Sequence, residues 1–303
     1  MRIKNLLSLV MLAVLASCSS NAQTDVNFTS PDAAAFSKYW YAGKAELTSY
    51  NLEQSRYGAT YKGHAVLIFV TEDFSNTKQV KLDNPKAAGT DAVKVLKLNF
   101  TKKFNTGIYP YSMMMSVFKP IDSNKYPHTL KVTTASQEWC GHTFMQLNLK
   151  KDAYHLSGYS YFESEGDVNR DIKKTLLEDE IWNIIRLNPE ALPIGDVTVI
   201  PATFISRLKH NALTNKKARA TLKLADNAQF VGDDLLVYEL KYSEPDRSLR
   251  IYFEKEFPHE IMGWEDTYKE MMTKATKRKS MQLDYWTKNS PADLIYREQL
   301  GLD

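Results

Sequence analysis

Segments with β-branched and aromatic residues at alternating positions recur along most of the chain, and this pattern constrains the fold more than any other feature. The clearest case lies near the middle, where Met145, Leu147 and Leu149 share one face of a strand and Gln146 and Asn148 the other. Gly, Pro, Asn and Asp bound such segments, as is typical of strands. The strands that we expect cover residues 45–57, 64–72, 79–82, 93–104, 112–118, 130–149, 154–162, 196–200, 203–209, 218–225, 235–242 and 248–257.

Two short polar segments predict tight turns between neighbouring strands. Lys150, Lys151 and Asp152 follow the alternating segment and precede the next one. Residues 242–246 contain Ser, Glu, Pro and Asp, which are turn formers or polar residues. Strands joined by such short connections pair antiparallel, so we expect hairpins at both places.

The hydrophobic period changes over residues 171–187, which predicts one amphipathic helix. Glu178, Asp179 and Glu180 lie between its apolar positions, and we interpret them as a solvated face rather than as general acids or bases. Residues 267–279 fit a helix or a strand equally well. The apolar positions with near-helical spacing are Ile172, Leu176, Leu177, Ile181, Ile184 and Ile185.

The predicted fold is mainly β, a curved antiparallel sheet or open half-barrel with this one central helix. Short helices are expected near the two ends, within residues 32–44 and 290–301. The elements divide into a first β-rich half at 31–165 and a second half at 166–303 that includes the central helix. This division is compatible with one continuous domain.

The first residues have the pattern of a bacterial lipoprotein signal peptide. Two basic residues precede roughly ten apolar ones, a length typical of a signal peptide and too short to span a bilayer. The segment closes with Leu-Ala-Ser-Cys, which resembles the lipobox, in which Cys18 is lipidated and becomes the new N-terminus. We expect residues 1–17 to be removed and residues 18–30 to form a flexible tether. An ordinary secretory signal, cut near Ala22, is the alternative.

Lipidation at Cys18 predicts a membrane anchor without a spanning helix, since each buried CH₂ of an acyl chain contributes about 0.8 kcal/mol. No acidic residue follows Cys18 directly, so the inner-membrane retention signal of some bacteria is absent. We therefore expect an envelope protein that contacts the membrane through its N-terminal lipid, on the outer membrane and facing the periplasm.

Charge and cysteine content limit the function classes. The signal peptide takes two of the 39 basic residues and none of the 36 acidic ones, so the mature chain is nearly neutral. This balance gives no electrostatic basis for nucleic-acid binding. With Cys18 lipidated, Cys140 is the one cysteine left, so we expect no internal disulfide and a core that depends on aromatic packing.

Residues 137–143 form the one cluster that suggests chemistry. On a continuous strand Glu138, Cys140 and His142 share a face, with neighbours about 6.5–7 Å apart. That distance usually exceeds the hydrogen-bond reach that a nucleophilic cysteine needs from its base. The row supplies at most three metal ligands, so we expect no metal and no cofactor. The alternative is a half-buried strand in which Cys140 packs as a small hydrophobe and Glu138 meets a cross-strand partner.

Aromatic residues also gather in short groups, at 39–41, 109–111, 159–162 and 285–286. Such side chains stack on sugar rings, line acyl-binding grooves or pack in a core. In an envelope protein they favour a binding role.

Three segments, at residues 39–46, 98–112 and 137–142, resemble a family of Gram-negative envelope lipoproteins. Members often carry the label "septum formation inhibitor Maf". True Maf proteins are cytosolic α/β nucleotide pyrophosphatases with a Ser-x-Ser-x-Arg-Arg motif near the N-terminus, which this chain lacks. The resemblance therefore implies an envelope lipoprotein and transfers no catalytic residues.

The sequence thus predicts an anchored protein that binds a lipid, a glycan or a protein of the envelope. One alternative is an envelope hydrolase that uses the face of Cys140 and His142. A further alternative is a structural assembly partner.

Overall fold

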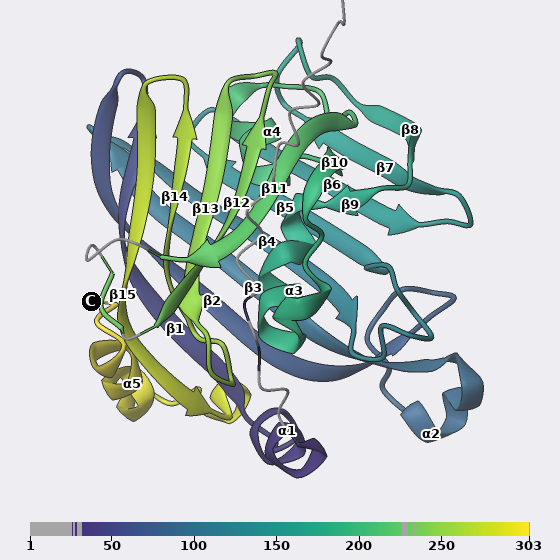
Figure 1. The fold of residues 1–303 in the computed structure, drawn as a ribbon. Helices are drawn as coiled ribbons and strands as arrows, with labels where there is room; N and C mark the ends of the chain where they lie inside the picture. The colour runs from purple at the N-terminus through teal and green to yellow at the C-terminus, as the bar shows by residue number, and fades with distance from the viewer. Residues whose placement is uncertain (1–25, 27, 29–31, 226–229, 233, 303) are drawn as a thin grey trace, which may run out of the picture.

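The structure is a computed structural model that describes residues 26, 28, 32–225, 230–232 and 234–302. Cys18 lies outside these residues, as do the expected signal peptide and most of the expected tether. The described chain is mainly β, as the sequence predicts, and forms one open, curved sheet (Figure 1).

The sheet has 15 strands in the described part of the chain, in the order β8-β7-β6-β5-β4-β3-β2-β1-β15-β14-β13-β12-β11-β10-β9. Neighbouring strands are antiparallel, except that β9 pairs parallel with β10. The strands are β1 (Ala45–Arg56), β2 (Ala59–Ser75), β3 (Ala92–Thr106), β4 (Tyr109–Pro120), β5 (Lys131–Glu138), β6 (Gly141–Leu149), β7 (Ala153–Ser160), β8 (Val168–Lys173), β9 (Leu176–Leu177), β10 (Gly195–Ile200), β11 (Lys216–Leu224), β12 (Leu235–Tyr242), β13 (Arg247–Glu254), β14 (Ile261–Tyr268) and β15 (Met271–Leu283).

The two edges of the sheet are consecutive in sequence, because β8 and β9 are separated only by Lys174 and Thr175. The sheet therefore curves until its edges approach each other, as in a barrel that is left open at one seam (Figure 1). Segment 213–215 contacts the β8 edge at this seam. Arg170 Nη2 of β8 donates to the carbonyl of Leu213 at 2.5 Å, and Asn215 Nδ2 donates to the carbonyl of Lys173 at 3.1 Å.

The helices are short. They are α1 (Ala33–Trp40), α2 (Pro85–Ala88), α3 (Ile181–Leu187), α4 (Thr203–Lys209) and α5 (Ile295–Gln299), and the 3-10 turns are η1 (Gly89–Asp91), η2 (Glu178–Glu180), η3 (Pro189–Ala191), η4 (Tyr285–Thr287) and η5 (Pro291–Leu294). The predicted helices near both ends are confirmed by α1, η5 and α5.

Alternating burial gives the sheet an inner face that holds the core. In β5, for example, Val132, Thr134, Ser136 and Glu138 are buried, while the residues between them are less so. Aromatic rings fill the centre, as expected: Phe100 lies 5.2–5.3 Å from the rings of three aromatic residues. These are Trp182 of α3, Phe204 of α4 and Trp264 of β14.

The predicted helix at 171–187 is wrong over its first half. Residues 168–173 form the edge strand β8, Leu176 and Leu177 form β9, and the α-helix begins at Ile181. The apolar residues of this segment fit a helical period, but Ile172 pairs with Tyr154 of β7 and Leu176 with Val199 of β10. Pairing with distant strands therefore overrides the local pattern.

The predicted strand at 203–209 is instead the helix α4. The carboxylate of Asp179 accepts hydrogen bonds from the backbone N–H and the hydroxyl of Thr203, at 3.1 and 2.9 Å. It thereby satisfies a free N–H of the first helical turn, the task that a local capping residue usually performs. Because the partner lies 24 residues away, the local sequence does not show this helix start.

The structure also decides the predicted hairpins, the ambiguous segment 267–279 and the predicted strand at 79–82. Both predicted hairpins are confirmed, since β6 pairs with β7 and β12 with β13. The ambiguous segment 267–279 is strand, divided between β14 and β15. The predicted strand at 79–82 is reduced to an isolated bridge between Phe74 and Lys81.

Candidate functional site

Glu138, Cys140 and His142 do not form a row on one strand. Glu138 ends β5, Cys140 lies in the tight turn, and His142 belongs to β6, where it pairs with Gln137. The chain reverses here, so the alternation that the prediction assumed is broken at its centre.

Glu138 is buried and ionically paired. Its carboxylate binds the guanidinium of Arg207 on α4 and accepts a 3.0 Å hydrogen bond from the hydroxyl of Tyr109. Arg207 also lies 3.4 Å from Glu165, which in turn contacts His210 Nδ1 at 2.6 Å. Tyr109 is on the neighbouring strand β4, so the expected cross-strand partner is present. This cluster attaches α4 to the inner face of the sheet.

Cys140 is exposed, and the expectation that it packs as a small hydrophobe is wrong. Its backbone N–H donates to the Tyr109 hydroxyl at 2.9 Å, and its thiol also contacts that hydroxyl. His142 is also exposed. In the described part of the chain, no three His, Cys, Asp or Glu side chains are placed to hold a metal ion.

The acidic turn 178–180 is buried, so the prediction of a solvated face is wrong. Glu178, Asp179 and Glu180 are 1–3% exposed. Glu178 accepts two hydrogen bonds of 2.6 Å from Arg247, a residue of β13. Burial and the charge of Glu178 raise the pKa of Asp179 to about 7. Each acid thus has a partner on an element that the sequence places far away.

Glu180 forms the polar floor of a cavity. One of its carboxylate oxygens accepts from Lys119 Nζ at 2.9 Å and from the hydroxyl of Thr129 at 2.6 Å. Lys119 Nζ also donates to the carbonyl of Pro127 at 2.7 Å. The second carboxylate oxygen accepts the N–H of Leu177 at 3.1 Å. The ion pair is therefore internally satisfied before any ligand arrives.

The cavity itself lies between α3, the C-terminal end of β4 and the loop that follows β4, and it measures about 440 Å³. This volume is in the range of pockets that bury a small-molecule ligand. Its walls are mostly apolar. They comprise Phe36, Pro120, Ile121, Pro127, Leu176, Ile184, Leu187, Ala191 and Pro193, together with Lys119, Ser123, His128, Glu180 and Asn188.

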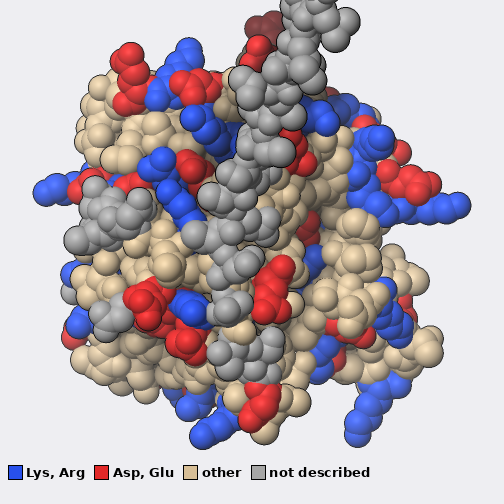
Figure 2. Space-filling model, in the orientation of Figure 1, with Lys and Arg blue, Asp and Glu red and all other residues tan. Residues whose placement is uncertain are grey.

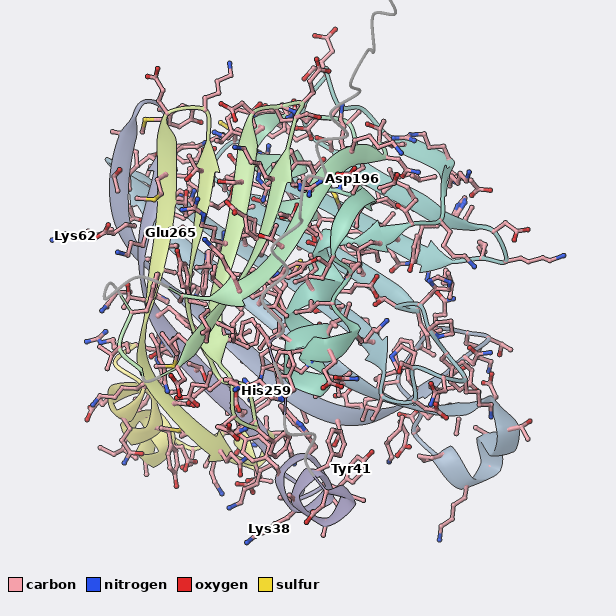
Figure 3. The ribbon with its side chains drawn as sticks, viewed as in Figure 1. Lys38, Tyr41, Lys62, Asp196, His259 and Glu265 are labelled. Carbon is pink, nitrogen blue, oxygen red and sulfur yellow. The ribbon has the colours of Figure 1, made fainter. Side chains whose placement is uncertain are left out.

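Helix α1 closes one side of the cavity through Phe36. The helix is held by its aromatic residues: the ring of Tyr39 packs edge-on against Phe257 at 5.6 Å, and its hydroxyl donates to the buried Glu46. The carbonyl of Trp40 accepts from Thr71 at 2.9 Å. Of the predicted aromatic group 39–41, Tyr39 and Trp40 thus pack, while Tyr41 lies beside α1 with 45% of its surface exposed and its ring 5.9 Å from that of Phe36 (Figure 3).

His128 lines the cavity without adding charge at neutral pH. Burial and the nearby positive charge of Lys174 lower the pKa of this imidazole. Because the Lys119–Glu180 pair is already neutral as a unit, the lining presents apolar surface and few free polar groups. Such a site favours the apolar part of a ligand over an ion.

Sequence reasoning missed the cavity residues Lys119, Glu180 and Ile184. The acids of the turn lie directly between Leu176-Leu177 and Ile181-Trp182, and apolar residues on both flanks were the available signal that the turn is buried. The partner Lys119 is 61 residues away, and no local pattern identifies it.

No protein-family model matches this chain, and no curated protein matches it. The fold is similar to the crystal structure of a beta-barrel-like protein of the domain of unknown function DUF1849 from Brucella abortus. The similarity has a TM-score of 0.48 at 8% sequence identity, and it covers 79% of this chain and 97% of that one.

Membrane and charge features can be stated for the described part of the chain. No helix there has the length and apolar character that crossing a bilayer requires. On the face drawn in Figure 2, basic and acidic side chains are interspersed, in keeping with the balanced composition.

Proposed function

We propose that this protein is an anchored envelope protein that binds the apolar chain of a lipid in the cavity beside α3. The observation that carries the proposal is the cavity lining, which is mainly apolar and whose one ion pair is internally satisfied. An acyl chain gains free energy by leaving water for such walls, at about 0.8 kcal/mol per CH₂. A glycan would need more free hydrogen-bonding groups than this lining offers.

The hydrolase alternative has less support. A cysteine hydrolase needs a base in hydrogen-bond reach of its thiol, and the group beside the Cys140 thiol is the hydroxyl of Tyr109, whose pKa is raised by burial. The role of an assembly partner has no specific contact to support it. We therefore retain lipid binding as the proposed function.

Binding of a fluorescent fatty acid, such as cis-parinaric acid, tests the cavity. Ala191 lines the cavity and is exposed, so Ala191→Trp fills it without replacing a core residue. The indole would displace several ligand methylenes, so we expect affinity to fall at least about tenfold. Ala87→Trp, on the exposed surface of α2, is the matched control and should bind like the wild type. Equal affinity of all three proteins would reject the cavity as the site.

The lipid anchor is tested separately in cells fed an alkyne analogue of palmitate. The lipobox pattern predicts label on the wild type and none on Cys18→Ser. A Cys140→Ser variant is the control and should keep the label. Label that persists in Cys18→Ser would contradict anchoring at this residue, without bearing on the cavity.

A further inference from the structure

The end of the sheet opposite the cavity carries exposed apolar side chains. The cavity lies at the Pro120 end of β4, whereas the tips of the β1–β2, β3–β4 and β5–β6 hairpins lie at the other end. These tips present Tyr57, Ile108 and Trp139, which are 69%, 83% and 64% exposed. We call this the hairpin end.

Aromatic contacts join the three tips into one patch. The hydroxyls of Tyr57 and Tyr111 lie 2.9 Å apart, and Tyr111 contacts Tyr109 with ring centroids 5.2 Å apart. Tyr109 in turn lies 6.0 Å from Trp139. The tip residues at 57–60, 105–110 and 139–142 include no Lys, Arg, Asp or Glu. The three large exposed side chains of the patch are therefore apolar or aromatic and have no Lys, Arg, Asp or Glu beside them at the tips.

Arg56 lies directly beneath this patch, 7% exposed. Its guanidinium lies over the ring of Tyr57 at 4.4 Å, donates to the Tyr57 hydroxyl at 3.1 Å and donates to the carbonyl of Leu208. Its Nε is buried and has no hydrogen-bond partner, and no carboxylate forms an ion pair with it among the described residues. The buried Arg186, by contrast, is paired with a carboxylate.

Lys209 adds a second cation at the same place. It follows Leu208 at the end of α4, and its Nζ lies 4.4 Å from the ring centroid of Tyr268. No ion pair involving Lys209 occurs in the described part of the chain. Burial, and after it the charge of Arg56, lower the pKa of Lys209. The nearby Asp266 is itself bound by Arg247 through two hydrogen bonds of 2.8 and 2.9 Å.

We infer that Arg56 and Lys209 form a site for the anionic headgroup of a membrane lipid, with Tyr57, Ile108 and Trp139 entering the membrane interface beside it. A buried cation without a counter-ion is costly, and an anionic ligand supplies what is missing. Tyr and Trp are the residues that favour the boundary between headgroups and acyl chains.

The surrounding side chains favour a membrane over other partners. Ile108 is aliphatic and cannot stack on a sugar ring, and it is more exposed than Tyr57 and Trp139. Behind the tips, Lys62 and Lys103 are exposed on the adjacent strands β2 and β3, and Lys62 points away from the sheet (Figure 3). Lys62 faces the exposed Glu53 across the β1–β2 pair, whereas Lys103 faces His64 and Ser112. Apolar tips with Lys103 behind them match the order of layers at an anionic membrane surface.

Vesicle flotation tests this site with residues 24–303, which include every helix and strand of the described fold. The vesicles are phosphatidylcholine with or without phosphatidylglycerol. We expect the wild type to prefer the anionic vesicles. Lys209→Gln should weaken that binding about fivefold, because one cation near an anionic surface contributes roughly 1 kcal/mol. Lys209→Arg keeps the positive charge and should bind like the wild type. Trp139→Ser should weaken binding to both kinds of vesicle.

The controls lie at the cavity end. Lys150→Gln and Trp286→Ser remove an exposed lysine and a half-exposed tryptophan there, and neither should change flotation. The inference is overturned if Lys209→Gln floats like the wild type, or if both vesicle types bind equally. It is also overturned if calorimetry shows that the protein binds inorganic phosphate while flotation shows no binding to vesicles. The site would then bind a dissolved anion and not a lipid headgroup. Fatty-acid binding in the cavity beside α3 is independent of all these results.

Discussion

Lys102 is a lysine that lies in the core among aromatic rings. Alternation along β3 places Phe100, Lys102 and Phe104 on one face, and all three side chains are buried. In the structure its ammonium lies 5.2–6.0 Å from the ring centroids of Phe100, Phe204 and Trp264. Burial lowers its pKa to about 8.

Replacing this lysine is expected to stabilise the protein near neutral pH. The folded pKa of about 8 lies below the ordinary value of 10.5, so the charge opposes folding, progressively more as pH falls from about 10.5 to about 8. Lys102→Met should raise the free energy of unfolding at pH 7 by roughly 1–3 kcal/mol, measured in urea. The exposed neighbour Lys103→Met should change it by less than about 0.5 kcal/mol. A destabilised Lys102→Met protein would contradict this account.

Asp179 should produce the opposite kind of pH dependence. Its pKa in the fold, about 7, lies above the ordinary value of 3.8, so the folded state holds a proton that the unfolded chain releases. The resulting stability is complete below about pH 4 and is lost as pH rises to about 7. Asp179→Asn should flatten the fall in unfolding free energy across this window. Parallel pH profiles for the two proteins would show that Asp179 does not titrate there.

At the scale of elements, local patterns predicted strands and hairpins, because alternation and turn residues are properties of neighbouring residues. They failed where a distant side chain decides the outcome. Helix α4 begins where Asp179 caps it, and the acidic turn is buried because Arg247 and Lys119 neutralise Glu178 and Glu180. The cavity could not be predicted for the same reason, since α1, β4 and α3 each supply only part of its lining.

Helix α3 is attached to β1 by one buried ion pair. Arg186 donates to the carboxylate of Glu46, and both side chains are 1% exposed. Glu46→Gln would leave the guanidinium charge buried without a counter-ion, so we expect a loss of about 3–5 kcal/mol in urea unfolding. Glu239→Gln breaks the more exposed pair with Arg250 and should cost less than about 1 kcal/mol. Similar losses for both variants would mean that burial does not govern this pair.

At the scale of the whole molecule, the two β-rich segments of the chain meet in one sheet, because β1 pairs with β15 along most of its length. The sequence predicted the many strands of this sheet, but it contains no local signal for a pairing between residues more than 200 positions apart. The central aromatic cluster also draws on both segments, through Phe100 and Trp264.

Continuous pairing predicts that the molecule unfolds as one unit. Tryptophan fluorescence, which reports on Trp40, Trp182 and Trp264 in the core, and far-ultraviolet circular dichroism should give the same urea midpoint. Two separated transitions would instead show that the segments are independently stable. Loss of the β1–β15 pairing would then leave part of the sheet folded.

The acyl chain of a lipid, in our proposal, lies in the cavity beside α3. The most direct test is a crystal structure of the protein with a fatty acid brominated near its methyl end, because the anomalous signal of bromine locates the chain without ambiguity. We expect a bromine peak between Ile184 and Leu187 of α3 and Ile121 after β4. A bromine peak elsewhere on the molecule, with the cavity holding only water, would contradict the account.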